Sequence, residues 1–125
     1  MSKILIVDDS AVVRDRLKQL LAGIGGLEIA EAAHAEHGKS LARKFKPDAI
    51  IIDVQLRNGR GIELLQEMKR IDPASRVIVL TNEAYPEIRN RCLAAGADYF
   101  FDKSTEYQEM VAVLRSGMPV RSGAH

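Results

Sequence analysis

Short apolar runs alternate with longer amphipathic stretches along the chain. Residues 3–7, 49–52 and 77–80 form runs of four or five residues that are almost entirely apolar. Such runs are typical of strands buried on both faces of a parallel sheet. Residues 27–30 and 98–101 predict two weaker strands. The first of these alternates apolar and polar residues, which is typical of a sheet edge.

The intervals between these strands have helical periodicity. Apolar or small side chains recur there at steps of three and four residues, so each interval predicts a helix with one face on a core. The five stripes are Val13, Leu17, Leu20 and Ile24; Gly38, Leu41, Ala42 and Phe45; Ile62, Leu65, Met68 and Ile71; Ile88, Cys92 and Ala95; and Tyr107, Met110, Val111 and Leu114. Thr105 and Gln108 predict a capping box at the start of the last helix.

Five strand–helix units in succession predict an α/β fold. Helices between strands require parallel pairing and right-handed crossovers. We therefore expect a flavodoxin-like, doubly wound, five-stranded parallel sheet of order 2-1-3-4-5, in a three-layer α/β/α sandwich. The edge-like strand at 27–30 agrees with this order. We expect one domain over residues 1–117, and a short disordered C-terminal tail over 118–125, where no pattern remains.

Composition limits the classes of function. The 125 residues include 18 basic and 17 acidic side chains, for a formal charge of +1. The sequence therefore lacks the basic footprint of a nucleic-acid-binding protein. The single cysteine excludes an internal disulfide and fits a reducing compartment. No apolar run approaches the roughly 18 residues of a membrane span, and the first run is too short for a signal peptide. We expect a cytoplasmic domain without a membrane partner.

Polar residues that could take part in binding or catalysis follow four of the five predicted strands. Asp8 and Asp9 end the first strand, Asp53 the third and Thr81 the fourth, and Lys103 follows the fifth. In an open parallel sheet, ligands bind beyond the carboxyl ends of the strands. We therefore expect three carboxylates, a hydroxyl and an ammonium group to converge at one edge.

Three neighbouring carboxylates need a compensating cation. Hard carboxylate oxygens suit Mg²⁺, which commonly binds through one or two carboxylates and a phosphate. Three carboxylates, one Mg²⁺ and Lys103 balance in charge, so the site can accept a phosphoryl group. Phosphoryl transfer needs mainly positioning and charge neutralisation. Asp53 is the predicted nucleophile, while Thr81 and Lys103 are predicted to contact phosphoryl oxygens.

These residues, together with Gly61 eight positions after Asp53, resemble a bacterial two-component response-regulator receiver domain of the stand-alone, chemotaxis-regulator-like type. The resemblance covers nearly the whole chain. It implies that Asp53 accepts a phosphoryl group from the phosphohistidine of a histidine kinase. It also implies that Asp9 and Asp53 bind Mg²⁺ directly with the backbone carbonyl of Gln55, and that Asp8 acts through a metal-bound water.

The resemblance further implies a switch pair and two positions that tune the phosphorylated state. Thr81 would be drawn to the phosphoryl group, and the ring of Phe100 would turn inward. Adjacent strand residues face opposite sides, so we expect only one of Phe100 and Phe101 to belong to the core. Gln55 and Glu83, two residues after the acceptor and the switch threonine, would set the lifetime of the phosphorylated state.

The sequence departs from the family pattern at three places. Arg57 replaces a frequent proline in a loop that is unusually basic and glycine-containing. Asn82 follows Thr81 where the family often has a small residue, and we expect it to narrow access to the phosphoryl group. Ser104 replaces a frequent cis-proline after the lysine. A cis bond before serine would cost about 3 kcal/mol, so we expect a trans or strained peptide there.

Several other features have plainer interpretations. His34 and His37 predict a solvated helix start rather than a metal pair. The glycine-rich segment 23–26 follows a helix rather than a strand, so it predicts a turn and not a dinucleotide loop. Cys92 is expected to be a small buried hydrophobe. Residues 89–91 predict a solvated helix face, with a docking role as the minority interpretation.

The leading hypothesis is a phosphorylation-controlled switch without an output domain of its own. Its expected partners are a sensor histidine kinase or phosphotransfer protein, and a downstream protein that binds the fourth helix, fifth strand and fifth helix. We expect a monomer or a phosphorylation-dependent dimer.

Three alternatives stay open. An aspartate-nucleophile phosphatase would need an acid where Gln55 stands. A flavodoxin-like electron carrier would place its cofactor phosphate against Asp8 and Asp9. The chain could also be the receiver fragment of a longer regulator.

Overall fold

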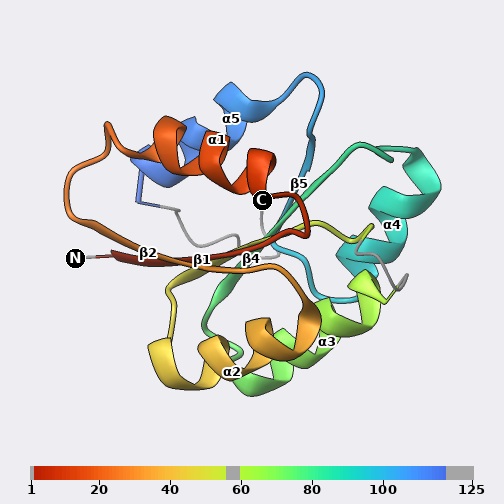
Figure 1. Ribbon diagram of the computed structural model, residues 1–125. Coiled ribbons are helices and arrows are strands. Elements are labelled where there is room, and N and C mark those ends of the chain that lie inside the picture. The colour runs from red at the N-terminus through yellow and green to blue at the C-terminus, as the bar shows by residue number, and fades with distance from the viewer. Residues whose placement is uncertain (1, 56–59, 118–125) are drawn as a thin grey trace.

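The computed structural model describes residues 2–55 and 60–117, in which five strands alternate with five helices (Figure 1). The strands are β1 (Ser2–Val7), β2 (Leu27–Ala32), β3 (Ala49–Ile52), β4 (Arg76–Thr81) and β5 (Tyr99–Asp102). The helices are α1 (Ala11–Leu21), α2 (Ala35–Phe45), α3 (Gly61–Ile71), α4 (Pro86–Ala94) and α5 (Tyr107–Arg115). Each predicted unit is therefore present, with strand ends shifted by one or two residues.

All neighbouring strands pair in parallel, in the order β2-β1-β3-β4-β5. The predicted doubly wound, flavodoxin-like fold is confirmed. Ile6, Ile51 and Ile78 stand in register across the three central strands. All four residues of β3 are buried, which explains why all four are apolar. The alternating strand β2 lies at an edge, as expected.

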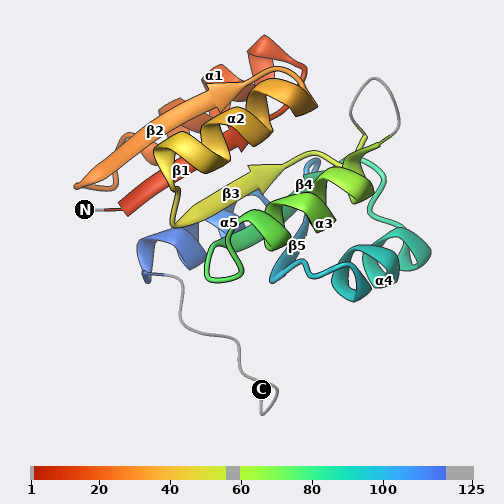
Figure 2. The ribbon, with the colours of Figure 1, turned by 90° about the horizontal axis from the view of Figure 1, so that it is seen from below.

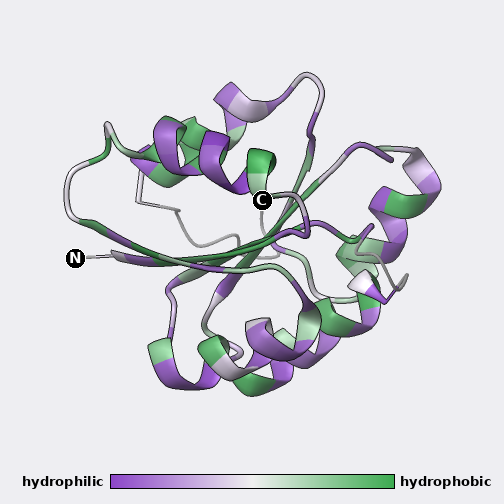
Figure 3. Ribbon diagram, in the orientation of Figure 1, coloured by the Kyte–Doolittle hydropathy of each residue, from purple (hydrophilic) through white to green (hydrophobic). Residues whose placement is uncertain are grey.

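Helices cover both faces of the sheet. Figures 1 and 2 show α1 and α5 on one face, and α2 and α3 on the other with α4 beside them. Successive strand residues point to opposite faces, so Ile51 packs with Leu17 and Met110 in one core while Ile52 packs with Met68 in the other. Figure 3 shows mixed hydrophobic and hydrophilic residues along the helices, as one-sided burial requires. None of the described helices is long and apolar enough to cross a membrane.

The end of α1 differs from the expected stripe. The helix stops at Leu21, so Ile24 packs against the core from the following turn and not from the helix. Leu21 lies outside the predicted stripe and is fully buried beside Leu17, one turn away. The start is capped by Ser10, whose hydroxyl accepts a hydrogen bond from the Val13 amide at 3.2 Å.

The predicted capping box of Thr105 and Gln108 is wrong. Glu106 is the residue that precedes α5, and it makes no side-chain cap bond. Hydrogen bonds between Asp102 and Glu106 form a local turn there instead. The Asp102 carbonyl accepts from the Glu106 amide at 2.8 Å, and Glu106 Oε1 accepts from the Asp102 amide at 2.8 Å. The Asp102 carboxylate accepts from the hydroxyl and amide of Ser104, and these bonds hold its pKa below the ordinary value.

Gly61 permits a close backbone approach at the start of α3. A Cβ atom at this position would lie 2.2 Å from both the Cα and the carbonyl oxygen of Val54. These are backbone atoms in the segment directly after Asp53, so a side-chain rotation cannot relieve the contact. Glycine at 61 therefore keeps α3 packed against the segment that leaves β3.

We expect Gly61→Ala to lower the free energy of unfolding by about 2–3 kcal/mol, because the added methyl group overpacks a backbone contact. Urea unfolding followed by far-ultraviolet circular dichroism measures this change. The control is Gly23→Ala, where a Cβ meets nothing within 4 Å, and its effect should stay within about 0.5 kcal/mol. Equal stability of the two variants would contradict the close approach.

Candidate functional site

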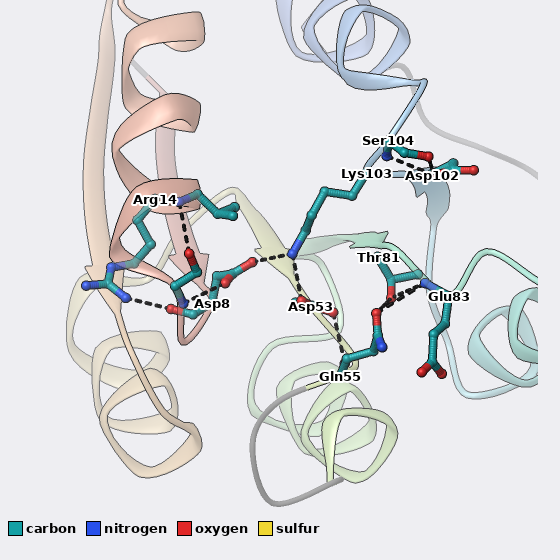
Figure 4. A network of polar contacts seen from close by, with 11 residues as sticks. Asp8, Arg14, Asp53, Gln55, Thr81, Glu83, Asp102, Lys103 and Ser104 are labelled. Carbon is teal, nitrogen blue, oxygen red and sulfur yellow. Dashed lines mark hydrogen bonds and ion pairs between the residues drawn. The ribbon is translucent and has the colours of Figure 1, made fainter.

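A lysine bridges two carboxylates at the carboxyl edge of the sheet (Figure 4). Lys103 Nζ lies 2.8 Å from Asp8 Oδ2 and 2.7 Å from Asp53 Oδ2. The three residues are buried, with exposed fractions of 7%, 3% and 8% respectively. They come from the ends of β1, β3 and β5, so the structure brings these three predicted site residues together.

The sheet itself fixes the backbone of these residues. The Asp53 amide donates to the Val7 carbonyl at 3.1 Å, and the Lys103 amide donates to the Thr81 carbonyl at 2.9 Å. The Asp8 amide likewise donates to the carbonyl of Ala32, the last residue of β2, at 3.1 Å. Each bond continues the parallel pairing one residue past a strand, so each side chain leaves the sheet at a fixed place.

Each carboxylate divides its two oxygens between a backbone amide and the lysine. Asp8 Oδ1 accepts from the Ser10 amide at 2.9 Å, and Asp53 Oδ1 accepts from the Gln55 amide at 2.9 Å. The other oxygen of each carboxylate binds Lys103. Two carboxylates therefore share one ammonium group and leave a net negative charge. Such a site can bind a further cation, and an anion can bind together with that cation.

Burial lowers the pKa of Lys103, but its hydrogen bonds to Asp53 and Asp8 outweigh that effect. The net result is a pKa above the ordinary lysine value of 10.5. The ammonium group therefore stays charged between the two carboxylates throughout the physiological range.

Arg14 supports Asp8 from α1, a contact that the sequence interpretation missed. Its NH1 donates to the Asp8 carbonyl at 2.7 Å, and its Nε donates to Glu31 Oε1 at 2.8 Å. Lys18 also binds Glu31. The sequence signal for this contact was the basic pair Arg14 and Lys18, one helical turn apart, together with the acidic Glu31 of the edge strand β2.

Asp9 lies in the bend after Asp8 and is partly exposed. Within residues 2–55 and 60–117, its carboxylate makes no hydrogen bond or ion pair. The same part of the chain holds no group of three His, Cys, Asp or Glu side chains placed to bind a metal. Lys103 Nζ binds the carboxylates of Asp8 and Asp53 and not that of Asp9. The metal role of Asp9 stays a prediction.

Thr81 is fully buried and joins Gln55 and Glu83 in a second polar cluster (Figure 4). Its hydroxyl donates to Gln55 Oε1 at 2.9 Å. The Glu83 amide donates to Gln55 Oε1 at 3.1 Å and to Thr81 Oγ1 at 3.2 Å. The residues assigned to phosphoryl contact and to lifetime tuning thus contact one another, and no sequence pattern predicted this contact.

Phe100 and Phe101 face opposite sides of β5, as predicted. Phe100 packs on the core beneath α2, α3 and α4, and Phe101 packs on the core beneath α1 and α5. The expectation that only one of them belongs to a core is wrong, because the edge strand has a core on each face and leaves both rings half-buried. Phe100 stands in register with Val79, so Phe100 and Thr81 point to the same face.

The remaining candidates lie outside the two polar clusters. His34 and His37 are exposed at the start of α2, in agreement with a solvated helix start. Cys92 is fully buried, and burial raises its pKa to about 11. No cis peptide bond occurs in the described segments, so the bond before Ser104 is trans. Arg57 lies outside the described residues.

Comparisons with known proteins identify a family. The family model described as response regulator receiver domain matches residues 4–115. Response regulator GacA of Pseudomonas aeruginosa is 34% identical over 116 residues, covering 92% of this chain and 54% of that protein. The KDP operon transcriptional regulatory protein KdpE of Escherichia coli is 35% identical over 115 residues, covering 92% and 50%. The chain spans about half the length of these curated relatives.

A solved structure agrees with these sequence matches. The CheY-like response regulator receiver domain protein of Methanospirillum hungatei superimposes with a TM-score of 0.85 at 28% identity, covering 94% of each chain.

We expect Lys103→Met to lower the free energy of unfolding at pH 7 by about 2–4 kcal/mol, because two buried carboxylates lose their shared cation. The control is Lys18→Met, which removes a lysine between two acids at the surface and should lower the free energy of unfolding far less, because exposed ion pairs contribute little to stability. Urea unfolding measures both changes.

The same pair of proteins tests the pH dependence. The pKa of Lys103 is raised by folding, so its stabilising contribution is fully present below about pH 10.5 and is lost as the pH rises through the folded value. The stability difference between wild type and Lys103→Met should therefore shrink above that pH. A difference that stays constant or grows there would contradict the bridge.

Proposed function

The chain belongs to the response regulator receiver domain family, and on that premise we propose that it is a phosphoacceptor switch of a two-component phosphorelay. Asp53 is the proposed acceptor, and a histidine kinase or phosphotransfer protein is the proposed donor. The observation that carries this proposal is the buried bridge from Lys103 to Asp53 and Asp8 at the carboxyl edge of the sheet.

The geometry of Asp53 suits nucleophilic attack on phosphorus. Its backbone is held by β1, and one carboxylate oxygen is held by the Gln55 amide. In the proposed step, an Asp53 oxygen forms a bond to phosphorus while the bond from phosphorus to the donor's imidazole nitrogen breaks. The imidazole nitrogen keeps the electron pair of that bond. Lys103 then pairs with a phosphoryl oxygen, and its ammonium group neutralises part of the negative charge of the transferred group.

The oxygen donors at this edge are of the kind that Mg²⁺ prefers, and this ion needs only one or two protein carboxylates. We propose that Asp9, Asp53 and the backbone carbonyl of Gln55 hold the ion directly, and that Asp8 does so through water. Supporting this, the Asp9 carboxylate has no bond to any other described residue. When bound, the ion would supply positive charge to the phosphoryl oxygens.

The proposed response runs from Thr81 and Phe100 to the surface formed by α4, β5 and α5. Thr81 and Phe100 share a face of the sheet, and β5 is an edge strand. Only Cys92 is buried among the nine residues of α4, so few contacts resist a shift of this helix. Residues 89–91 are exposed on it and form part of the proposed docking surface for a downstream protein.

Receiver domains are generally signalling switches rather than enzymes, and position 55 supports this assignment here. A phosphatase using Asp53 would need a proton donor and acceptor two residues later. Gln55 has no titratable proton, and its amide oxygen already accepts two hydrogen bonds. Slow hydrolysis of phosphorylated Asp53 is the only turnover that we propose.

Incubation with acetyl phosphate and Mg²⁺ tests the acceptor. Intact-mass spectrometry should detect one added phosphoryl group on wild type and none on Asp53→Asn, which has no nucleophilic carboxylate. Asp15→Asn alters an exposed acid of α1 and should gain the group as wild type does. An unmodified wild type, or the same gain on Asp53→Asn, overturns the proposal.

A further inference from the structure

The hydroxyl of Thr81 has a single proton, and in this structure that proton is already engaged. Thr81 Oγ1 lies 2.9 Å from Gln55 Oε1 and 3.2 Å from the Glu83 amide nitrogen. A backbone amide only donates hydrogen bonds. The Glu83 amide therefore approaches an oxygen lone pair of Thr81, and the hydroxyl proton remains for Gln55.

The same amide group fixes the orientation of the Gln55 side chain. The Glu83 amide also lies 3.1 Å from Gln55 Oε1. If the side-chain amide were flipped, its NH2 group would face the Glu83 amide, which can only donate, and that contact would become donor against donor. The oxygen of Gln55 must therefore point inward, where it accepts from both Thr81 and Glu83.

We propose that the Gln55 side chain is a positioning residue that holds Thr81 in the resting state by competing with the phosphoryl group for the hydroxyl proton. This inference rests on the proposed phosphorylation of Asp53. Thr81 cannot donate to Gln55 and to a phosphoryl oxygen at the same time, because it has one proton. Formation of the phosphorylated state then requires the exchange of one acceptor for the other.

Gln55 is placed to connect this exchange with the acceptor. Its backbone amide donates to Asp53 Oδ1 at 2.9 Å, while its side chain accepts from Thr81. After release of Thr81, Gln55 Oε1 keeps the Glu83 amide as a partner. The side chain is also partly exposed, so water can replace the lost bond. The resting state is therefore favoured by about one neutral hydrogen bond, which corresponds to roughly a fivefold bias.

Gln55→Met tests the competition, because methionine is similar in length and lacks the strong acceptor. Beryllofluoride with Mg²⁺ serves as the phosphoryl mimic, and nuclear magnetic resonance titration gives its dissociation constant. We expect Gln55→Met to bind about fivefold more tightly than wild type. The matched control is Gln66→Met, an exposed glutamine of α3 in the same groove as Gln55, and its affinity should equal that of wild type.

A double-mutant cycle with Thr81→Ala separates this role from a general structural effect. If Gln55 acts through the Thr81 hydroxyl, Gln55→Met should leave the affinity unchanged in the Thr81→Ala background. A fivefold gain that persists there overturns the competition, as does unchanged or weaker binding by Gln55→Met alone. Failure of wild type to bind the mimic would instead count against the proposed function itself.

Discussion

The bridge from Lys103 to Asp8 and Asp53 is the interaction on which the site depends. Its members are separated by 95 and 50 residues in sequence, and they meet only when the sheet is complete from β1 to β5. Desolvation makes a buried ion pair costly, and the cost is limited here because backbone amides bind the second oxygen of each carboxylate. The fold therefore maintains a concentrated charge that would be expensive without the sheet around it.

Asp53 connects this charge cluster to the hydrogen bonds around Thr81. One oxygen of its carboxylate binds Lys103 and the other binds the Gln55 amide. A group attached to Asp53 would therefore disturb both neighbours at once. On the Lys103 side the change is electrostatic, whereas on the Gln55 side it concerns the partner of one hydroxyl proton. The second change points toward α4, which has few buried residues with which to resist it.

The sequence predicted the features that depend on backbone pattern. Continuous apolar runs identified three buried strands, whose ends located Asp8, Asp53 and Thr81, and the weaker fifth strand located Lys103. The features that it missed depend on side-chain competition in three dimensions. Thr105 fits a capping pattern, but the turn built by Asp102 and Glu106 takes its place.

Residues near element ends show the same limit. A helical stripe does not reveal that α1 ends before Ile24, because turn residues can reach the same core. Arg14 offers the reverse case: its charge is visible in the sequence, but its hydrogen bond to the Asp8 carbonyl depends on how α1 crosses β1. The role of position 55 follows from the same kind of contact. A carboxyl group there could give or take a proton during hydrolysis, as an enzyme requires. The amide of Gln55 adds no charge, and its oxygen binds Thr81 and the Glu83 amide. In the proposed function, this one side chain would therefore favour control of Thr81 over turnover, as a switch requires.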